Sequence, residues 1–157
     1  MYIPINVDGH KYLSRKINII KQNIMELTDE KSQLLEQGDI RENSGLDIVN
    51  ESLNIMRKKL KKLEEIRNYT MVITENIAKV GSRIILADGT KIILTLFKNL
   101  VNRGELEMYI SSELQMAKDI FYKKEGDIHT YSFGGVIKNT TIRSIIDLGD
   151  MFETIEG

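Results

Sequence analysis

The first half of the chain places apolar residues at the spacing of a coiled-coil seam. They recur at intervals of four and three residues at Leu13, Ile17, Ile20, Ile24 and Leu27, and the seam resumes at Leu34 after Lys31. After a break the same spacing returns at Leu46, Val49, Leu53, Met56, Leu60 and Leu63. Residues at these intervals fall on one side of an α-helix. The pattern therefore predicts two amphipathic helices of about 25 residues, each about 40 Å long.

The connection between these two stretches is short and includes Gly38 and Gly45. Short connections join antiparallel neighbours, so we expect the two helices to fold back on each other as a hairpin. The faces away from the seam are polar, with Arg15, Lys16, Lys21, Gln22, Lys58, Lys59, Lys61, Lys62 and Glu65. Because only one seam is apolar, we expect the hairpin to project into solvent.

The second half changes to the short apolar runs that are typical of strands. Runs at 83–87 and 91–97 flank Asp88-Gly89, which is a strong signal for a hairpin turn. Further strands are expected at 107–111, 128–133 and 140–147, with a helix over 114–122 and Gly134-Gly135 joining the last two strands. The predicted fold is α+β. It consists of an antiparallel coiled-coil hairpin over residues 1–74 and a small β-rich domain with one helix over residues 75–157.

Composition narrows the possible chemistry. The 157 residues have a formal net charge of −1, no cysteine and two histidines. A net charge this close to zero disfavours non-specific binding to the nucleic acid backbone. The lack of cysteine excludes disulfides, zinc ribbons and thiol catalysis. No cysteine or acidic cluster accompanies His10 or His129 at ligand spacing, so both are expected at the surface or at a helix edge. No signal-peptide pattern or membrane-length apolar run is present, so we expect a cytoplasmic protein.

The predicted connection carries two acids, Asp39 and Glu42, three residues apart. At a helix start such carboxylates point the same way, and together they can hold a magnesium ion if a partner supplies the other ligands. The same spacing also fits a capping box, in which Asp39 accepts from the N–H of Glu42 and Glu42 reaches back. The pattern alone favours the cap.

A basic run at 57–62 lies on the second predicted helix. Its candidate contacts to RNA phosphates are Arg57, Lys58, Lys61 and Lys62. The alternative is a solvated outer face whose partners along the helix are Glu64 and Glu65. No aromatic residue interleaves with the run, so base stacking is not predicted.

The order of these features resembles the bacterial Gre transcript-cleavage factors over nearly the whole chain. The resemblance is carried by the opening run 3–13, the tip Gln37-Gly38-Asp39-Ile40-Arg41-Glu42-Asn43, the strands of 80–97, the turn at 123–127 and Gly134-Gly135. The whole set in this order is more specific than the tip motif alone. The resemblance implies an FKBP-like fold for residues 75–157.

The resemblance also implies an activity. Gre factors dock their C-terminal domain at the rim of the RNA polymerase secondary channel and insert the hairpin into it. The tip acids, here Asp39 and Glu42, would help to hold a magnesium ion in the polymerase active centre. The polymerase would then hydrolyse backtracked nascent RNA at its 3′ end. The implied protein is a monomer that does not bind a membrane. It has no cofactor of its own and is not itself an enzyme.

Departures from the family pattern predict an alternative. Ser44-Gly45-Leu46 stands where the family has an acid and an aromatic residue, and an Arg-Pro pair in the first helix is absent. The segment thought to dock on polymerase keeps only the basic residue of the family pattern. Its docking candidates are Gln115, Met116 and Lys118. The alternative is a non-cleaving regulator that occupies the channel and competes with cleavage factors. A third hypothesis is a generic interaction module that uses its coiled coil as a scaffold.

Overall fold

The computed structural model describes residues 2–37, 44–102 and 104–157 of the chain. They form two compact units, of which one is residues 13–68. The other combines the residues up to Tyr12 with Tyr69–Gly157. The first unit is helical, and the second is built on β-sheet. No helix in the described ranges has both the length and the apolar character needed to cross a bilayer.

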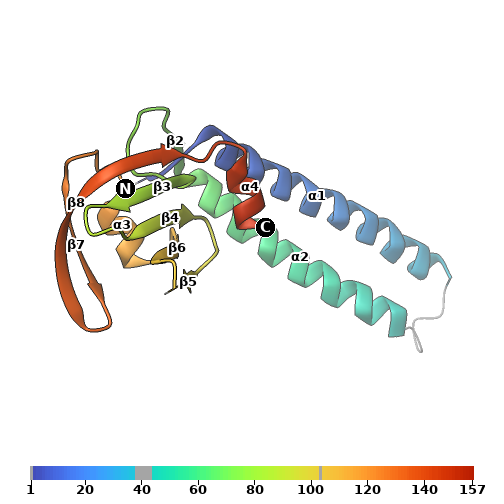
Figure 1. Cartoon of the computed structure of the whole chain (residues 1–157). Helices are drawn as coiled ribbons and strands as arrows, with labels where there is room; N and C mark the ends of the chain where they lie inside the picture. Colours follow the sequence, from blue (N-terminus) through green and yellow to red (C-terminus); the bar gives the residue numbers. More distant parts are fainter. Residues whose placement is uncertain (1, 38–43, 103) are drawn as a thin grey trace. The chain divides into compact units, whose positions relative to one another are not determined.

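The helical unit is an antiparallel pair. Most of α1 (Val7–Glu36) and all of α2 (Ser44–Asn68) lie side by side (Figure 1). The apolar seam is their protected side, because Ile17, Val49 and Leu53 are buried and the remaining seam residues are at least partly buried. Lys21 Nζ and the Glu64 carboxylate pair across the two helices at 3.6 Å. The predicted helical hairpin is confirmed.

Helix α1 begins six residues before the first seam position because Asn6 caps it. The backbone N–H of Gly9 donates to Oδ1 of Asn6 at 2.7 Å, which satisfies one of the free donors of the first turn. Nδ2 of the buried Asn6 donates to the Gly81 carbonyl at 3.2 Å and to the Asp147 carboxylate at 2.9 Å. The cap therefore also joins the helix start to the sheet unit.

A six-stranded sheet forms the second unit, in the order β5-β6-β4-β3-β8-β7. Its strands are β3 (Ser82–Leu86), β4 (Lys91–Thr95), β5 (Leu100–Asn102), β6 (Glu107–Ser111), β7 (Ile128–Phe133) and β8 (Val136–Asp147). All neighbours are antiparallel except β4 and β6, which run parallel. The core of this unit includes Ile84, Leu86, Ile92, Ile93 and Leu94, all without solvent exposure.

Strand β8 is long and visibly curved (Figure 1). Its first half pairs with β7 and its second half with β3, where the register shifts between Ile85 and Leu86. Such a shift bends a strand and increases its twist. The strand starts at Val136, earlier than predicted, because Gly134 and Gly135 both adopt positive φ, at 62° and 80°. Two residues therefore suffice for the turn.

The turn at Asp88-Gly89 and the helix after β6 are also found. Gly89 has φ of 90°, and the N–H of Thr90 donates to Oδ1 of Asp88 at 3.0 Å. Helix α3 (Gln115–Ile120) ends before the predicted limit, because Phe121 has an extended ψ of 142° and Tyr122 has a positive φ of 70°.

Four elements have no counterpart in the sequence pattern. They are β1 (Ile3–Ile5), β2 (Thr70–Val72), which pairs in parallel with β1, the edge strand β5, and α4 (Met151–Glu156). Elements of three to six residues are too short to show a period.

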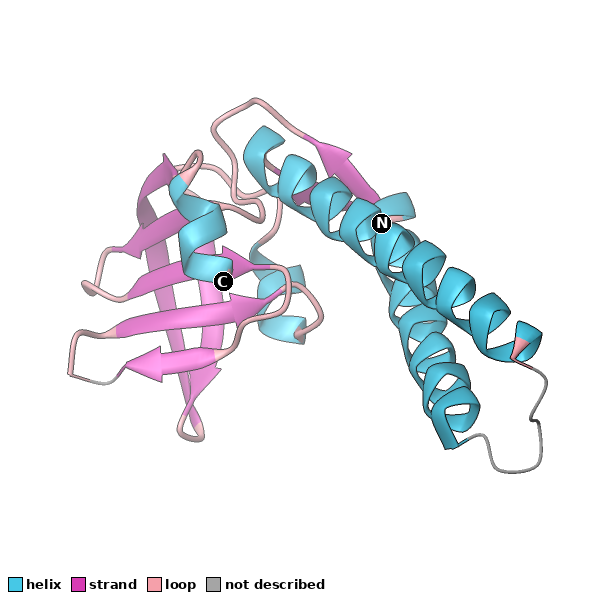
Figure 2. Ribbon diagram, turned by 90° about the vertical axis from the view of Figure 1, so that its right-hand side faces the viewer, coloured by secondary structure: helices cyan, strands magenta, loops and turns pink. Residues whose placement is uncertain are grey.

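Helix α4 is held by one apolar anchor and one carboxylate. Phe152 is fully buried, and its ring meets that of Tyr12 edge-on at 6.1 Å. The Glu156 carboxylate accepts hydrogen bonds from the backbone N–H groups of Leu96, Phe97 and Lys98 at 2.7–3.2 Å. Figure 2 shows this short helix beside the strands. The carboxylate therefore satisfies backbone N–H groups that have no hydrogen-bond partner within the sheet.

Candidate functional site

The two acids predicted as metal ligands, Asp39 and Glu42, lie outside the described residues. Described structure ends at Gln37 on the side of α1 and resumes at Ser44 with the start of α2. The motif therefore falls within the interval between the two arms of the hairpin. Both their interpretations, a helix cap and half of a magnesium site, stay predictions.

The four basic candidates on α2 are all exposed: Arg57, Lys58, Lys61 and Lys62. At 3.6 residues per turn they fall within an arc of about 140° on the helix side away from the seam. Within the described ranges, Arg57, Lys58 and Lys61 form no ion pair within 4 Å. Glu64, proposed as a partner along the same helix, pairs instead with Lys21 of α1. Three cations on one exposed face can contact phosphates.

The docking candidates lie on α3 and differ in their surroundings. Gln115 is exposed and its Nε2 donates to Oδ1 of Asp119 at 2.8 Å, so its amide is engaged within the helix. Met116 is partly buried and lines a shallow depression together with Ile137. Lys118 is exposed, while the adjacent Ala117 is fully buried against the sheet unit. The structure thus brings a cation and a soft apolar side chain to one exposed helix.

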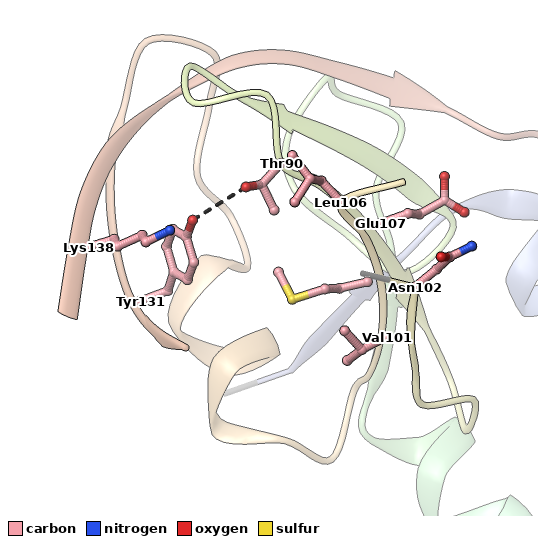
Figure 3. A pocket seen from close by; sticks show the side chains of 8 residues that line it. Thr90, Val101, Asn102, Leu106, Glu107, Tyr131 and Lys138 are labelled. Carbon is pink, nitrogen blue, oxygen red and sulfur yellow. Dashed lines mark hydrogen bonds between the residues drawn. The ribbon is translucent and has the colours of Figure 1, made fainter. Parts of the chain in front are cut away.

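A cavity that the sequence did not reveal lies in the sheet unit, with a volume of about 180 Å³. Figure 3 shows the side chains around it. The lining residues come from several elements and are Thr90, Val101, Asn102, Leu106, Glu107, Met108, Tyr131 and Lys138. Sequence reasoning missed it because the residues lie far apart along the chain. The available signals, the apolar residues Val101 and Leu106 beside a Gly-containing turn, are weak.

The Tyr131 side chain of this cavity is held by hydrogen bonds. Its hydroxyl donates to Oδ2 of Asp88 at 2.7 Å and lies 3.4 Å from Oγ1 of Thr90. Partial burial acts to raise the pKa of Asp88, but the hydrogen bonds from Tyr131 and Thr90 and the nearby Lys138 charge hold this pKa below its ordinary value. Burial in turn raises the pKa of Tyr131. Asp88 is thus an anion and Tyr131 a neutral donor at neutral pH.

The prediction that His129 lies at the surface or at a helix edge is wrong. This residue is on β7 and its side chain is fully buried, with its ring stacked on Tyr131 at 5.7 Å. Lys123 Nζ lies 3.5 Å from Nδ1, while Nε2 is buried and has no hydrogen-bond partner within the described ranges. Burial and the Lys123 charge lower the pKa of His129, so its ring is neutral at neutral pH. His10 lies on α1 and is partly buried.

Comparison with known proteins found no matching family model and no matching curated protein. Three similar solved structures have low sequence identity. GreA factor homolog 1 (Gfh1) of Thermus thermophilus is 17% identical with a TM-score of 0.47, covering 93% of this chain and 99% of its own. Thermus aquaticus Gfh1 is 17% identical with a TM-score of 0.45, covering 92% and 97%. Another structure of the transcription factor Gfh1 is 16% identical with a TM-score of 0.46, covering 92% and 97%. At these values none of the three assigns a function to this chain.

Proposed function

We propose that this protein is a Gre-type accessory factor of RNA polymerase, which inserts its helical hairpin into the secondary channel and stimulates cleavage of backtracked RNA. One observation carries the proposal. The acidic motif that contains Asp39 and Glu42 falls between the end of α1 at Glu36 and the start of α2 at Ser44. Two long helices with a buried seam therefore flank the acids on both sides.

The length of the arms supports delivery of these acids to a distant site. Helix α1 has 30 residues and α2 has 25, which correspond to about 45 and 38 Å at 1.5 Å per residue. The Lys21–Glu64 ion pair and the buried seam hold the two helices together. A paired helical arm is stiffer than a loop of equal length. It can therefore carry two carboxylates into a narrow cavity.

The chemistry would belong to the polymerase. Metal ions there stabilise the attacking and leaving oxygens of phosphodiester hydrolysis. Asp39 and Glu42 would add carboxylate oxygens, which are the ligands that magnesium prefers. In this proposal the chain has no catalytic centre of its own. Arg57, Lys58, Lys61 and Lys62 would contact RNA phosphates, while Gln115, Met116 and Lys118 would contact the polymerase.

A second candidate is a regulator that occupies the channel without stimulating cleavage. Helix α2 begins with Ser44-Gly45-Leu46, and Gly45 in its first turn lowers helix stability relative to alanine. The acid and the aromatic residue that the resemblance leads us to expect are missing from this turn. In this candidate the protein occupies the channel but does not order a metal ion and a water there.

One assay separates these candidates. Backtracked polymerase complexes with 3′-labelled RNA are mixed with the protein over a series of magnesium concentrations. We expect release of short 3′ fragments, and loss of that release with Asp39→Asn or Glu42→Gln. Asn and Gln keep the size of the side chains but remove their charge. Failure to release fragments at every magnesium concentration would refute the cleavage proposal.

Competition with an authentic cleavage factor tests the second candidate. If the protein blocks that factor without cleaving RNA, the regulator is supported. If it neither cleaves nor competes, neither candidate holds, and a polymerase-independent coiled-coil scaffold becomes the remaining hypothesis.

A further inference from the structure

The two ends of the six-stranded sheet contribute opposite walls of the cavity in the sheet unit. Val101 and Met108 are direct cross-strand partners on β5 and β6, at one end of the strand order. Tyr131 and Lys138 are direct partners on β7 and β8, at the other end. These ends line one cavity only because the sheet is strongly curved. Cavities at the mouths of curved or barrel-like sheets are common ligand sites.

The wall on β5 and β6 is open to solvent and combines the apolar Val101, Leu106 and Met108 with Asn102 and Glu107. Met108 is 5% exposed and forms its closed side, whereas Val101 is 48% and Leu106 is 56% exposed. Leu106 has a φ of 50°, which is unfavourable for a side chain with a Cβ. Its carbonyl accepts a hydrogen bond from the N–H of Lys91 at 2.8 Å, which helps to hold this conformation. The strained backbone keeps an exposed leucine at the cavity.

The opposite wall is fixed before any ligand arrives. The Tyr131 ring stacks on the buried His129 ring, with an angle of 7° between the planes. Its hydroxyl is anchored on Asp88 at 2.7 Å. The Tyr131 side chain is thus held by stacking at its ring and by a hydrogen bond at its hydroxyl. A wall that does not need to be ordered on binding reduces the entropic cost of association.

The charges around the cavity restrict its ligand. Lys138 lies close enough to Asp88 to lower its pKa, and the Lys138 ammonium forms no ion pair within 4 Å in the described ranges. Figure 3 shows the polar ends of Asn102 and Glu107 directed away from Tyr131 and Lys138. A cation in the cavity would be repelled by Lys138. An anion would be repelled by Glu107, which lines the cavity, and by Asp88, which accepts a hydrogen bond from the Tyr131 hydroxyl. A neutral ligand with a hydrogen-bond acceptor avoids both repulsions and can use the Lys138 ammonium as donor.

From these contacts we infer that the cavity binds a small uncharged molecule with an apolar body the size of one aromatic ring and a carbonyl-type acceptor. The size follows from the volume of about 180 Å³. A protein cavity of about 150 Å³ is known to hold benzene. The body lies between Met108, Val101 and Tyr131, and the acceptor faces Lys138. The site belongs entirely to the sheet unit and does not depend on the hairpin or on polymerase.

Three ring-sized probes of similar size but different charge test this inference: benzamide, benzoate and benzylammonium. Each is titrated into the full chain while methyl NMR signals of Val101, Leu106 and Met108 are followed. We expect saturable shifts with benzamide and a dissociation constant on the order of 1 mM. The two charged probes should bind roughly tenfold more weakly, because each meets a like charge. Absence of saturable shifts with benzamide, or equal binding of all three probes, would overturn the inference.

A cavity-filling variant supplies the matched comparison. Val101→Phe places a ring in the cavity and should weaken benzamide roughly tenfold or more. Leu100→Phe changes the neighbouring residue of the same edge strand, which is 50% exposed but does not line the cavity, and should leave binding unchanged. Equal effects of the two variants would contradict the site.

The exposed Lys138 provides a second test that does not alter the wall on β5 and β6. Lys138→Met removes the donor and its charge, so benzamide should bind more weakly and benzylammonium more tightly. If benzylammonium affinity stays unchanged while the variant remains folded, Lys138 does not face the ligand and the inference fails.

Discussion

His129 makes stability depend on pH through a single buried ring. Its pKa in the folded protein is lowered by burial and then by Lys123, whereas in the unfolded chain it returns to the ordinary value of 6.5. The unfolded state therefore binds the proton more readily. The contribution of His129 is fully present above pH 6.5 and is lost as pH falls from there through the lower folded pKa.

The first prediction follows from this sign. Urea unfolding at a series of pH values should show stability that falls between pH 7.5 and 5, by at most about 1.4 kcal/mol per pH unit for one proton. His129→Phe should flatten this part of the profile, because it removes the titrating ring and its unpaired Nε2. The chain has two histidines, so His10→Gln is the control variant that removes the other one. An unchanged slope in His129→Phe would assign the pH dependence to other groups.

Glu156 is the second residue whose side chain is expected to affect the stability of the fold. Its carboxylate is the acceptor for three consecutive backbone N–H groups, of which those of Leu96 and Phe97 are partly buried. Glu156→Ala leaves these donors without the acceptor and should lower the free energy of unfolding by about 1–3 kcal/mol. Glu156→Gln keeps one oxygen and should lose less.

Asp150→Ala is the matched control for Glu156, because Asp150 is the N-cap residue of the same short helix and makes no side-chain cap hydrogen bond. Thermal or urea unfolding of the three variants measures the order of stabilities. Equal losses for Glu156→Ala and Asp150→Ala would show that the helix matters and the carboxylate does not.

At the level of elements, α2 combines two roles on opposite sides. Its seam side, with Leu53 and Leu63 buried, holds the hairpin together, while its outer side carries the cations. Arg57→Gln, Lys58→Gln and Lys61→Gln should therefore leave helix content unchanged, because glutamine is a good helix former. If these side chains contact RNA phosphates, each should weaken binding to a polymerase–RNA complex and reduce its dependence on salt.

Affinity measured at several salt concentrations checks this prediction, with circular dichroism as the test of folding. Lys59→Gln is the control, since Lys59 is exposed on the same helix but does not belong to the predicted RNA contacts. If Lys59→Gln and Lys61→Gln change the salt dependence equally, the cations act only through overall charge.

The elements differ in how well the sequence alone predicts them. The hairpin and the turn at Asp88-Gly89 are predictable, because many residues repeat one period in the first case and Gly89 needs its positive φ in the second. Strand β5 and helix α4 are too short to reveal a period. The burial of His129 is not predictable either, because it depends on pairing within the curved hairpin of β7 and β8. The cavity is missed for the same reason, since Met108 and Tyr131 line one cavity only through sheet curvature.

At the level of the whole molecule, the proposed function divides the chain into a part that binds and a part that acts. Lys118 and Met116 lie on α3 of the sheet unit, whereas Asp39 and Glu42 belong to the interval between the arms of the helical unit. Changes in the two places should therefore have different consequences. Under the proposed function, loss of docking should remove every effect on polymerase, and loss of the acids should remove only cleavage.

The fourth prediction tests this division. Lys118→Glu reverses an exposed charge without touching the buried Ala117 or Ile120, so the fold should persist. It should weaken both fragment release and competition with an authentic cleavage factor by the same factor, roughly tenfold for the loss of one favourable charge contact. Asp39→Asn should abolish fragment release at saturating protein and leave competition intact. Loss of competition in Asp39→Asn would mean that the acids serve binding, and retained competition in Lys118→Glu would move the docking surface away from α3.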